Sequence, residues 1–184
     1  MRLLVVPGSL RLGSYNVALA QAARELAPDG VEVDVYRDLG AVPPYDADAD
    51  GPAPPAAVRE LRERIAEADA VLFVTPEYNG SVSGVLKNAI DWASRPPGAA
   101  ALTGKTVAVA GVTTGQYGAI WAQQDLRRIL GIAGARVIEG ELPVARAQDV
   151  FDGEGRLLDD GVAARLRQHL ENLVAEASRV AIAA

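Results

Sequence analysis

A run of five apolar residues, AVLFV at positions 70–74, is the best strand candidate in this chain of 184 residues. A continuous apolar run of this length is typical of a strand that is buried on both faces of a parallel sheet. Working outward, similar runs occur at 3–6 (LLVV) and 106–112 (TVAVAGV), and an alternating run occurs at 31–35 (VEVDV). A fifth strand is expected to begin over 136–138. The chain therefore has five strand candidates.

Helical patterns separate these strands. Because strands and helices alternate, we expect an α/β fold of three layers, with helices on both faces of a five-stranded parallel sheet. The expected strand order is 2-1-3-4-5. Ligands of such sheets bind beyond the carboxyl ends of the strands, where the strand order reverses, which here is between strands 1 and 3. The expected helices cover about 15–27, 58–68, 85–93, 120–130 and 162–180.

Composition excludes several classes of function. The formal net charge of −6 argues against nucleic acid or an anionic membrane as the main partner, because both require a basic surface. The chain has no cysteine, which excludes disulfides, thiolate nucleophiles and thiolate metal sites. The apolar start at 3–6 is too short for a signal-peptide core, and no stretch approaches the length of a membrane span. We therefore expect a cytoplasmic protein.

The loop after the first strand, GSLRLGSYN at 8–16, leads directly into a predicted helix. The N-terminus of a helix carries a partial positive charge and unpaired N–H groups, which suit an anion. Ser9, Ser14 and Asn16 add short polar groups, and Arg11 adds a planar charged group. Together they suit a terminal phosphate monoester. The alternative is that the serines and the asparagine only cap the helix.

Other phosphate and metal motifs fit less well. The loop has no G-K-[S/T] ending and no G-x-G-x-x-G, and a phosphatase-like loop would need a cysteine. Without that glycine pattern, Asp38 is not expected to act as the ribose-binding acid of a dinucleotide fold. The acidic stretch 46–50 lacks the glycine and glutamate of a calcium loop and is expected to be a solvated loop. No metal site is expected.

The loop after the third strand, TPEYNGSVSG at 75–84, follows the run AVLFV. Pro76 and the glycines keep this loop out of regular structure and leave backbone N–H groups free. Tyr78 offers an aromatic face, and Asn79 offers a hydrogen-bonding edge. A flat heterocycle with nitrogen and oxygen atoms on its rim would suit the loop. The alternative is an ordinary strand-to-helix turn with Asn-Gly at its centre.

Three motifs together resemble those of the NADPH-dependent FMN reductase family: GSLRxxSxN at 8–16, PEYNGS at 76–81 and LKNAIDW at 86–92. The family includes flavoprotein quinone, azo-dye and chromate reductases, and the similarity in element order covers nearly the whole chain. It implies a flavodoxin-like three-layer sandwich, with residues 1–184 as one FMN-binding domain. It also implies an NAD(P)H-dependent oxidoreductase that passes electrons from NADPH or NADH to quinones, to similar small acceptors or to free FMN.

The resemblance further implies which residues bind the cofactor. The first loop would hold the FMN phosphate, the second would lie along the isoalloxazine ring, and the loop 113–118 would close over its other side. No protein acid, base or nucleophile is required, because the flavin performs the redox chemistry. A homodimer or homotetramer is implied, with 85–92 and 40–55 as candidate contacts. The implied cofactor-binding residues are Ser9, Arg11, Ser14, Tyr15, Asn16, Pro76, Glu77, Tyr78, Asn79, Gly80, Thr113, Thr114 and Gly115.

Two other functions stay open at this level. One is a flavodoxin-like electron carrier without intrinsic NAD(P)H oxidation, although the mildly acidic charge favours the enzyme. The other is a regulatory or phosphate-binding domain without flavin; a response-regulator relative would need an aspartate where Thr75 stands. Outside the loops, His169 is expected to be structural, and Trp92 and Trp121 are expected to be packing or subunit-contact residues.

Overall fold

The computed structural model describes residues 1–183, and the chain begins with a strand followed by a helix at the predicted positions. The strands are β1 (Arg2–Pro7), β2 (Glu32–Val35), β3 (Ala70–Thr75), β4 (Thr106–Val112), β5 (Arg136–Val137) and β6 (Leu142–Val144). The α-helices are α1 (Tyr15–Glu25), α2 (Ala56–Glu67), α3 (Gly84–Ala93), α4 (Ile120–Ile132), α5 (Ala147–Val150) and α6 (Asp160–Ala183), and two 3₁₀ turns, η1 (Leu39–Ala41) and η2 (Ala47–Ala49), lie before α2.

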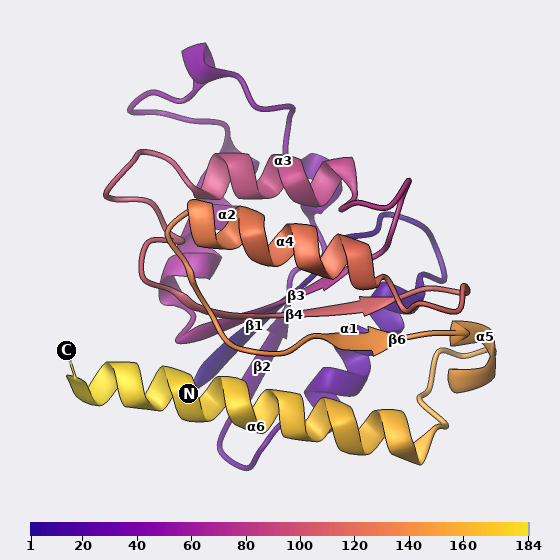
Figure 1. Cartoon of the computed structure of the whole chain (residues 1–184). Helices are drawn as coiled ribbons and strands as arrows, with labels where there is room; N and C mark the ends of the chain where they lie inside the picture. Colours follow the sequence, from indigo (N-terminus) through magenta and orange to yellow (C-terminus); the bar gives the residue numbers. More distant parts are fainter. Residues whose placement is uncertain (184) are drawn as a thin grey trace.

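The strands form one parallel sheet in the order β2-β1-β3-β4-β5, and β6 also pairs with β4. In its register, Val5 of β1 lies beside Leu72 of β3, which lies beside Ala108 of β4. Figure 1 shows α2, α3 and α4 over one face of the sheet and α1 and α6 over the other. The predicted three-layer architecture and strand order are confirmed.

Strand β3 is buried on both faces because successive side chains point into different cores. Leu72 joins the core that packs beneath α1 and α6. Val71 and Phe73 join the opposite core, beneath α2, α3 and α4. This explains why β3 reads as a continuous apolar run rather than an alternating one.

Two short strands, β5 and β6, share the fifth strand position beside β4, whereas the sequence predicts one short strand there. After Val137 the chain leaves the sheet and returns at Leu142, so β5 and β6 pair with different parts of β4. A side chain of α4 hydrogen-bonds to the backbone between β5 and β6: Arg127 donates to the carbonyl oxygens of Ile138 and Gly140, at 2.6 and 2.9 Å. Helix α4 therefore stabilises the interruption through a side chain 11 to 13 positions away, a tertiary contact that hydrophobic periodicity does not reveal.

His169 fills the gap that this interruption leaves in the sheet. Residues 108 and 109 of β4 face the space between β5 and β6, and Nε2 of His169 lies 2.9 Å from the carbonyl oxygen of Val109. Because a carbonyl can only accept, His169 is the donor. The expected structural role of this histidine is confirmed.

The long loop between β2 and α2 is closely attached to the helices. Asp50 forms an ion pair with Arg62 of α2 at 2.8 Å, and both side chains are largely buried. The expectation that the whole acidic stretch 46–50 is solvated is therefore wrong for Asp50, because a partner distant in sequence compensates its burial.

Trp92 is buried, as expected. Among residues 1–183, no group of acidic and histidine side chains is arranged to bind a metal. None of the helices in that range is long and apolar enough to cross a bilayer.

Candidate functional site

The loops after β1, β3 and β4 emerge at one edge of the sheet, on the right in Figure 1, because parallel strands end on the same side. The first two loops are in direct contact. The N–H group of Gly8 donates to the carbonyl oxygen of Val74 at 2.7 Å, and Oγ of Ser83 donates to the carbonyl oxygen of Gly8 at 2.6 Å. A Cβ atom on Gly8 would lie 2.9 Å from Cδ2 of Leu86, so any side chain here would force the buried Leu86 to move.

In the first loop, Ser14 is the N-cap of α1, and its Oγ accepts the N–H group of Asn16 at 3.2 Å. Ser14 therefore caps α1, and its expected contact with a ligand stays a prediction. Ser9 and Arg11 make only local contacts: Oγ of Ser9 accepts the N–H group of Arg11 at 3.4 Å, and the guanidinium reaches the carbonyl oxygen of Gly13 at 3.3 Å. Arg11 is exposed, so its guanidinium is available to a ligand anion at the start of α1.

Asn16 carries a buried polar atom without a partner. The residue is 4% exposed, and its Oδ1 has no hydrogen-bond partner among residues 1–183. Buried polar atoms are normally hydrogen-bonded, so this one indicates that a donor from a ligand or water belongs there. A phosphorylated polyol such as the ribityl phosphate of FMN provides hydroxyl donors together with an anion. The residues present therefore fit that group.

The second loop contains a tight hairpin. The N–H groups of Tyr78 and Ser81 donate to each other's carbonyl oxygens, at 3.0 and 3.1 Å. Asn79 and Gly80 between them have φ angles of 53° and 73°, as in a type I′ turn. The Asn-Gly pair thus forms a reversing turn of its own and projects Tyr78, which is 53% exposed, at the edge of the site.

The side chain of Glu77 is attached to α4. Its Oε2 accepts the N–H group of Ala122 in the first turn of that helix, at 3.1 Å. The N-cap of α4 is Ala119, which has no side-chain acceptor, so Glu77 satisfies an N–H group that the helix's own sequence leaves unpaired. The backbone of Glu77 is part of the second loop, while its carboxylate is hydrogen-bonded to α4.

The third loop is held by β6 and by the segment that follows it. The N–H group of Thr113 donates to Val144, and the N–H group of Arg146 donates to Gly115, at 3.1 and 2.9 Å. Within the loop, Oγ1 of Thr113 accepts the N–H group of Gly115 at 2.8 Å, while Thr114 is exposed. The structure therefore places all the predicted site residues at one edge, in the three loops and in the first turn of α1, to which Tyr15 and Asn16 belong.

Exposed apolar side chains concentrate at this edge. Eight large apolar residues are prominently exposed among the described residues, and five of them lie in the three loops or the first turn of α4. Tyr117 and Trp121 form an edge-to-face pair with ring centroids 4.9 Å apart. Trp121 is 48% exposed, so it is not a core residue, and its predicted subunit contact stays a prediction. Such a cluster marks a ligand or partner surface. The five residues are Leu10, Leu12, Tyr78, Tyr117 and Trp121.

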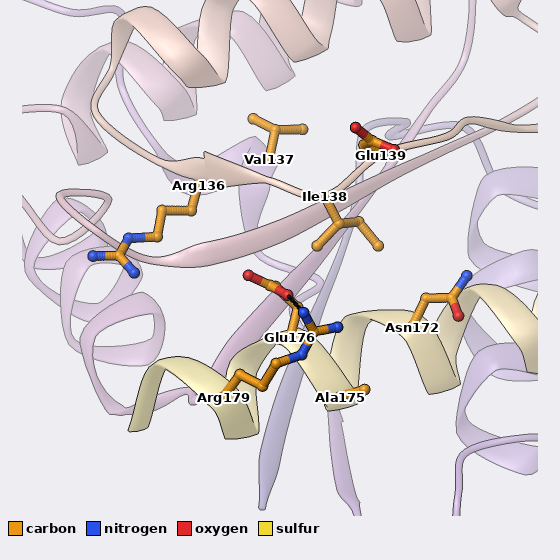
Figure 2. Close-up of a pocket in the computed structure, with 8 residues that line it drawn as sticks. All are labelled: Arg136, Val137, Ile138, Glu139, Asn172, Ala175, Glu176 and Arg179. Atoms are coloured by element: carbon orange, nitrogen blue, oxygen red, sulfur yellow. Dashed lines mark ion pairs between the residues drawn. The ribbon is translucent and has the colours of Figure 1, made fainter. Parts of the chain in front are cut away.

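Two cavities help to delimit the site. Figure 2 shows one of about 450 Å³ between β5 and α6, where Glu176 and Arg179 form an ion pair at 3.2 Å. Its lining residues belong to none of the three loops, so this cavity is separate from the site. A second cavity, of about 700 Å³, shares Gln116 and Tyr117 with the third loop and is also lined by Arg146. The second cavity extends the site toward β6.

Sequence reasoning missed Asp125, which reaches the second loop from α4. Its Oδ2 accepts the hydroxyl group of Ser81 at 2.8 Å. Asp125 lies within a regular helix, 44 positions from Ser81, and nothing in its local sequence distinguishes it from an ordinary surface residue. Only the packing of α4 against the loop after β3 brings the two side chains together.

Comparisons with known proteins agree with this arrangement. A family model described as NADPH-dependent FMN reductase matches residues 1–149. An NAD(P)H-dependent FMN reductase of Pseudomonas aeruginosa is 43% identical over 174 residues, which cover 94% of this chain and 93% of that protein. A quinone reductase of Pseudomonas putida is 43% identical over 156 residues, covering 84% of this chain and 83% of that protein.

A solved structure shows the same fold at high similarity. It is that of a flavoenzyme NAD(P)H:(acceptor) oxidoreductase from Paracoccus denitrificans, with a TM-score of 0.84 and 35% sequence identity. The match covers 97% of each chain, so it includes α6 as well as the sheet and its three loops.

Proposed function

The chain belongs to the NADPH-dependent FMN reductase family, and on that basis we propose that this NAD(P)H-dependent flavin oxidoreductase reduces quinones or similar small acceptors. The observation that supports the proposal best is the convergence of the three polar loops at the carboxyl edge of the sheet, at the reversal of strand order between β1 and β3. The electron-carrier and flavin-free alternatives have no comparable support from the relatives.

In this proposal each loop binds a different part of FMN. The first loop holds the phosphate, with Arg11 supplying a charged donor and Asn16 supplying the buried amide beside α1. Residues 76–80 of the second loop lie along one side of the isoalloxazine ring, and 113–115 lie along the other. Ser9, Ser14 and Tyr15 complete the phosphate site.

When bound, FMN would supply the redox chemistry, namely acceptance of hydride from NADPH or NADH and donation of electrons to the acceptor. The chain's own residues bind and orient. The two hydrogen bonds within the hairpin keep its turn rigid, and the attachment of Thr113 and Gly115 to the β6 segment keeps the opposite wall in place. The exposed rings of Tyr78 and Tyr117 border the space where a flat acceptor would enter. No protein acid or base is assigned.

The proposal includes assembly of the chain as a homodimer or homotetramer in the cytoplasm, where nicotinamide nucleotides are available. A groove of about 520 Å³ between α3 and α4 supports self-association, because its mixed lining combines apolar residues such as Ile129 and Ile132 with charged ones that include Asp125. Ile132 is 78% exposed, and an exposed isoleucine in a groove suits contact with a second copy. In light scattering, Ile132→Glu should lower the mass of the assembly; an unchanged mass would exclude this groove as the contact.

The deciding experiment is an absorbance titration of the purified protein with FMN, followed by anaerobic addition of NADPH and then NADH. Flavin bands that shift on binding, bleach rapidly with reductant and return with added benzoquinone would support the proposal. Bound bands that do not bleach would instead indicate an electron carrier. Absence of any binding would exclude the flavin site.

A further inference from the structure

We propose that Asp125 is a positioning residue for the flavin-binding hairpin. Together with Glu77 it fastens residues 78–81 to helix α4 and so sets the affinity for FMN and the reduction potential of the bound flavin. The inference rests on the proposed function only for its consequence for FMN. The fastening itself is a property of the chain and can be tested without the cofactor.

The first attachment joins the end of the hairpin to the second turn of α4. Oγ of Ser81 donates to Oδ2 of Asp125 at 2.8 Å, and Oδ1 of the same carboxylate accepts Nη2 of Arg128 at 3.4 Å. The carboxylate is about one-third exposed, so it is neither a core group nor a freely moving surface group. Because both oxygens are engaged, the side chain has a defined direction, and it fixes the hydroxyl group of Ser81.

The second attachment joins the beginning of the hairpin to the first turn of α4. Oε2 of Glu77 accepts the N–H group of Ala122 at 3.1 Å. The two attachments therefore lie on either side of the turn formed by Asn79 and Gly80, one before it and one after it. A segment held at one point can pivot, whereas a segment held at both ends keeps its orientation relative to the helix.

The hairpin between the two attachments carries the groups that would contact the flavin ring. The hairpin's own two hydrogen bonds use the N–H groups of Tyr78 and Ser81. They do not use those of Asn79 and Gly80 at the turn. Donors that already point to where negative charge develops stabilise that charge strongly, and the effect depends on their position. A hairpin that pivots away from α4 would therefore bind FMN less tightly and shift its reduction potential.

The test compares Asp125→Ala with Asp125→Asn, Ser81→Ala and a neighbouring exposed control, Gln124→Ala. In the cofactor-free protein, amide hydrogen exchange at Tyr78 and Ser81 should be about five- to tenfold faster in Asp125→Ala and Ser81→Ala, as loss of one net hydrogen bond implies. In the holoprotein, both variants should bind FMN about fivefold more weakly. Their reduction potential should also be shifted, and the melting temperature should stay close to that of the wild type.

Asp125→Asn retains an oxygen that can accept the hydroxyl group of Ser81, so it should restore exchange and FMN affinity to near wild-type values. Gln124→Ala should change neither. The proposal is overturned if Asp125→Ala leaves hairpin exchange unchanged, or if it accelerates exchange without altering FMN affinity and potential. A wild-type protein that binds no FMN would instead refute the proposed function, while the exchange data would still decide whether Asp125 holds the hairpin.

Discussion

The N–H group of Tyr45 donates to Oδ1 of Asn88 at 2.8 Å, which attaches the long loop between β2 and α2 to helix α3. The same amide donates through Nδ2 to the carbonyl oxygen of Pro43 at 2.8 Å, and Nε1 of Trp92 donates to that carbonyl at the same distance. The asparagine and the tryptophan of the motif LKNAIDW therefore have a structural explanation. They give a loop without regular structure the backbone hydrogen bonds that it would otherwise lack.

Removal of the Asn88 amide should detach this loop. Asn88→Ala leaves the N–H group of Tyr45 and a carbonyl of Pro43 with fewer partners in a half-buried place, so we expect a loss of about 1–3 kcal/mol in the free energy of unfolding. Urea denaturation measures this. The matched control is Lys87→Ala, which removes only a surface ion pair with Asp91 and should cost less than about 0.5 kcal/mol. Equal costs for the two variants would show that the loop does not depend on Asn88.

Arg11 provides a direct test of the phosphate site. The guanidinium is exposed and makes one long hydrogen bond to Gly13, so Arg11→Ala should leave protein stability almost unchanged. Loss of a charge-assisted hydrogen bond to the FMN phosphate should weaken FMN binding by about 10- to 100-fold.

Riboflavin, which lacks the phosphate, is the control ligand for Arg11. Its affinity should be the same for the wild type and for Arg11→Ala in a fluorescence titration. If both ligands weaken equally, then Arg11 shapes the ring site rather than the phosphate site. If neither weakens, the phosphate is bound elsewhere.

The sequence predicts the parts of this molecule that local rules determine. Apolar runs such as 70–74 and 106–112 are continuous because both faces are covered, and this periodicity is visible without a structure. The loops at 8–16 and 75–84 are recognisable because helix starts and Asn-Gly turns have short-range signatures. The edge at which they meet follows from parallel topology alone.

The remaining features depend on contacts between distant segments. The division of β5 from β6 depends on Arg127, which lies 11 and 13 positions from the carbonyl groups it contacts, and on His169, which lies 60 positions from Val109. The attachment of Glu77 to Ala122 and of Ser81 to Asp125 spans 45 and 44 positions. No window of local sequence contains both partners of such a pair, so pattern reasoning has no signal for it.

Gly118 should be intolerant of any side chain. It has a φ angle of +59°, and a Cβ atom there would lie 2.7 Å from the backbone nitrogen of Val144 and 2.8 Å from the carbonyl carbon of Pro143. Left-handed strain and the backbone clash together should lower the free energy of unfolding of Gly118→Ala by about 2–4 kcal/mol.

Gly30→Ala separates the two causes, because Gly30 has a φ angle of +79° with nothing within 4 Å of the added atom. It should cost only about 1 kcal/mol. Similar costs in urea denaturation would mean that the third loop and β6 separate easily.

The pH dependence of stability should be governed by His169 just below its ordinary pKa of about 6.5, because it is the chain's only histidine. Burial lowers the pKa of His169 most strongly. The nearby charge of Arg127 also lowers the pKa, while the hydrogen bond to Val109 and the charge of Glu141 oppose the shift. The folded state therefore holds the neutral ring at a pH where the unfolded chain is already protonated.

Since the unfolded state then binds more protons, stability rises with pH through this window. The contribution of His169 is fully present above the unfolded pKa of about 6.5, and it is lost as pH falls toward the lower folded pKa. The slope contributed by His169 should reach at most about 1.4 kcal/mol per pH unit. His169→Gln keeps a donor for Val109 but does not titrate, so urea denaturation of this variant should lack the slope contributed by His169. If the variant retains the wild-type slope, carboxylates rather than the histidine control acid sensitivity, and the ring is not held neutral by its burial against β4.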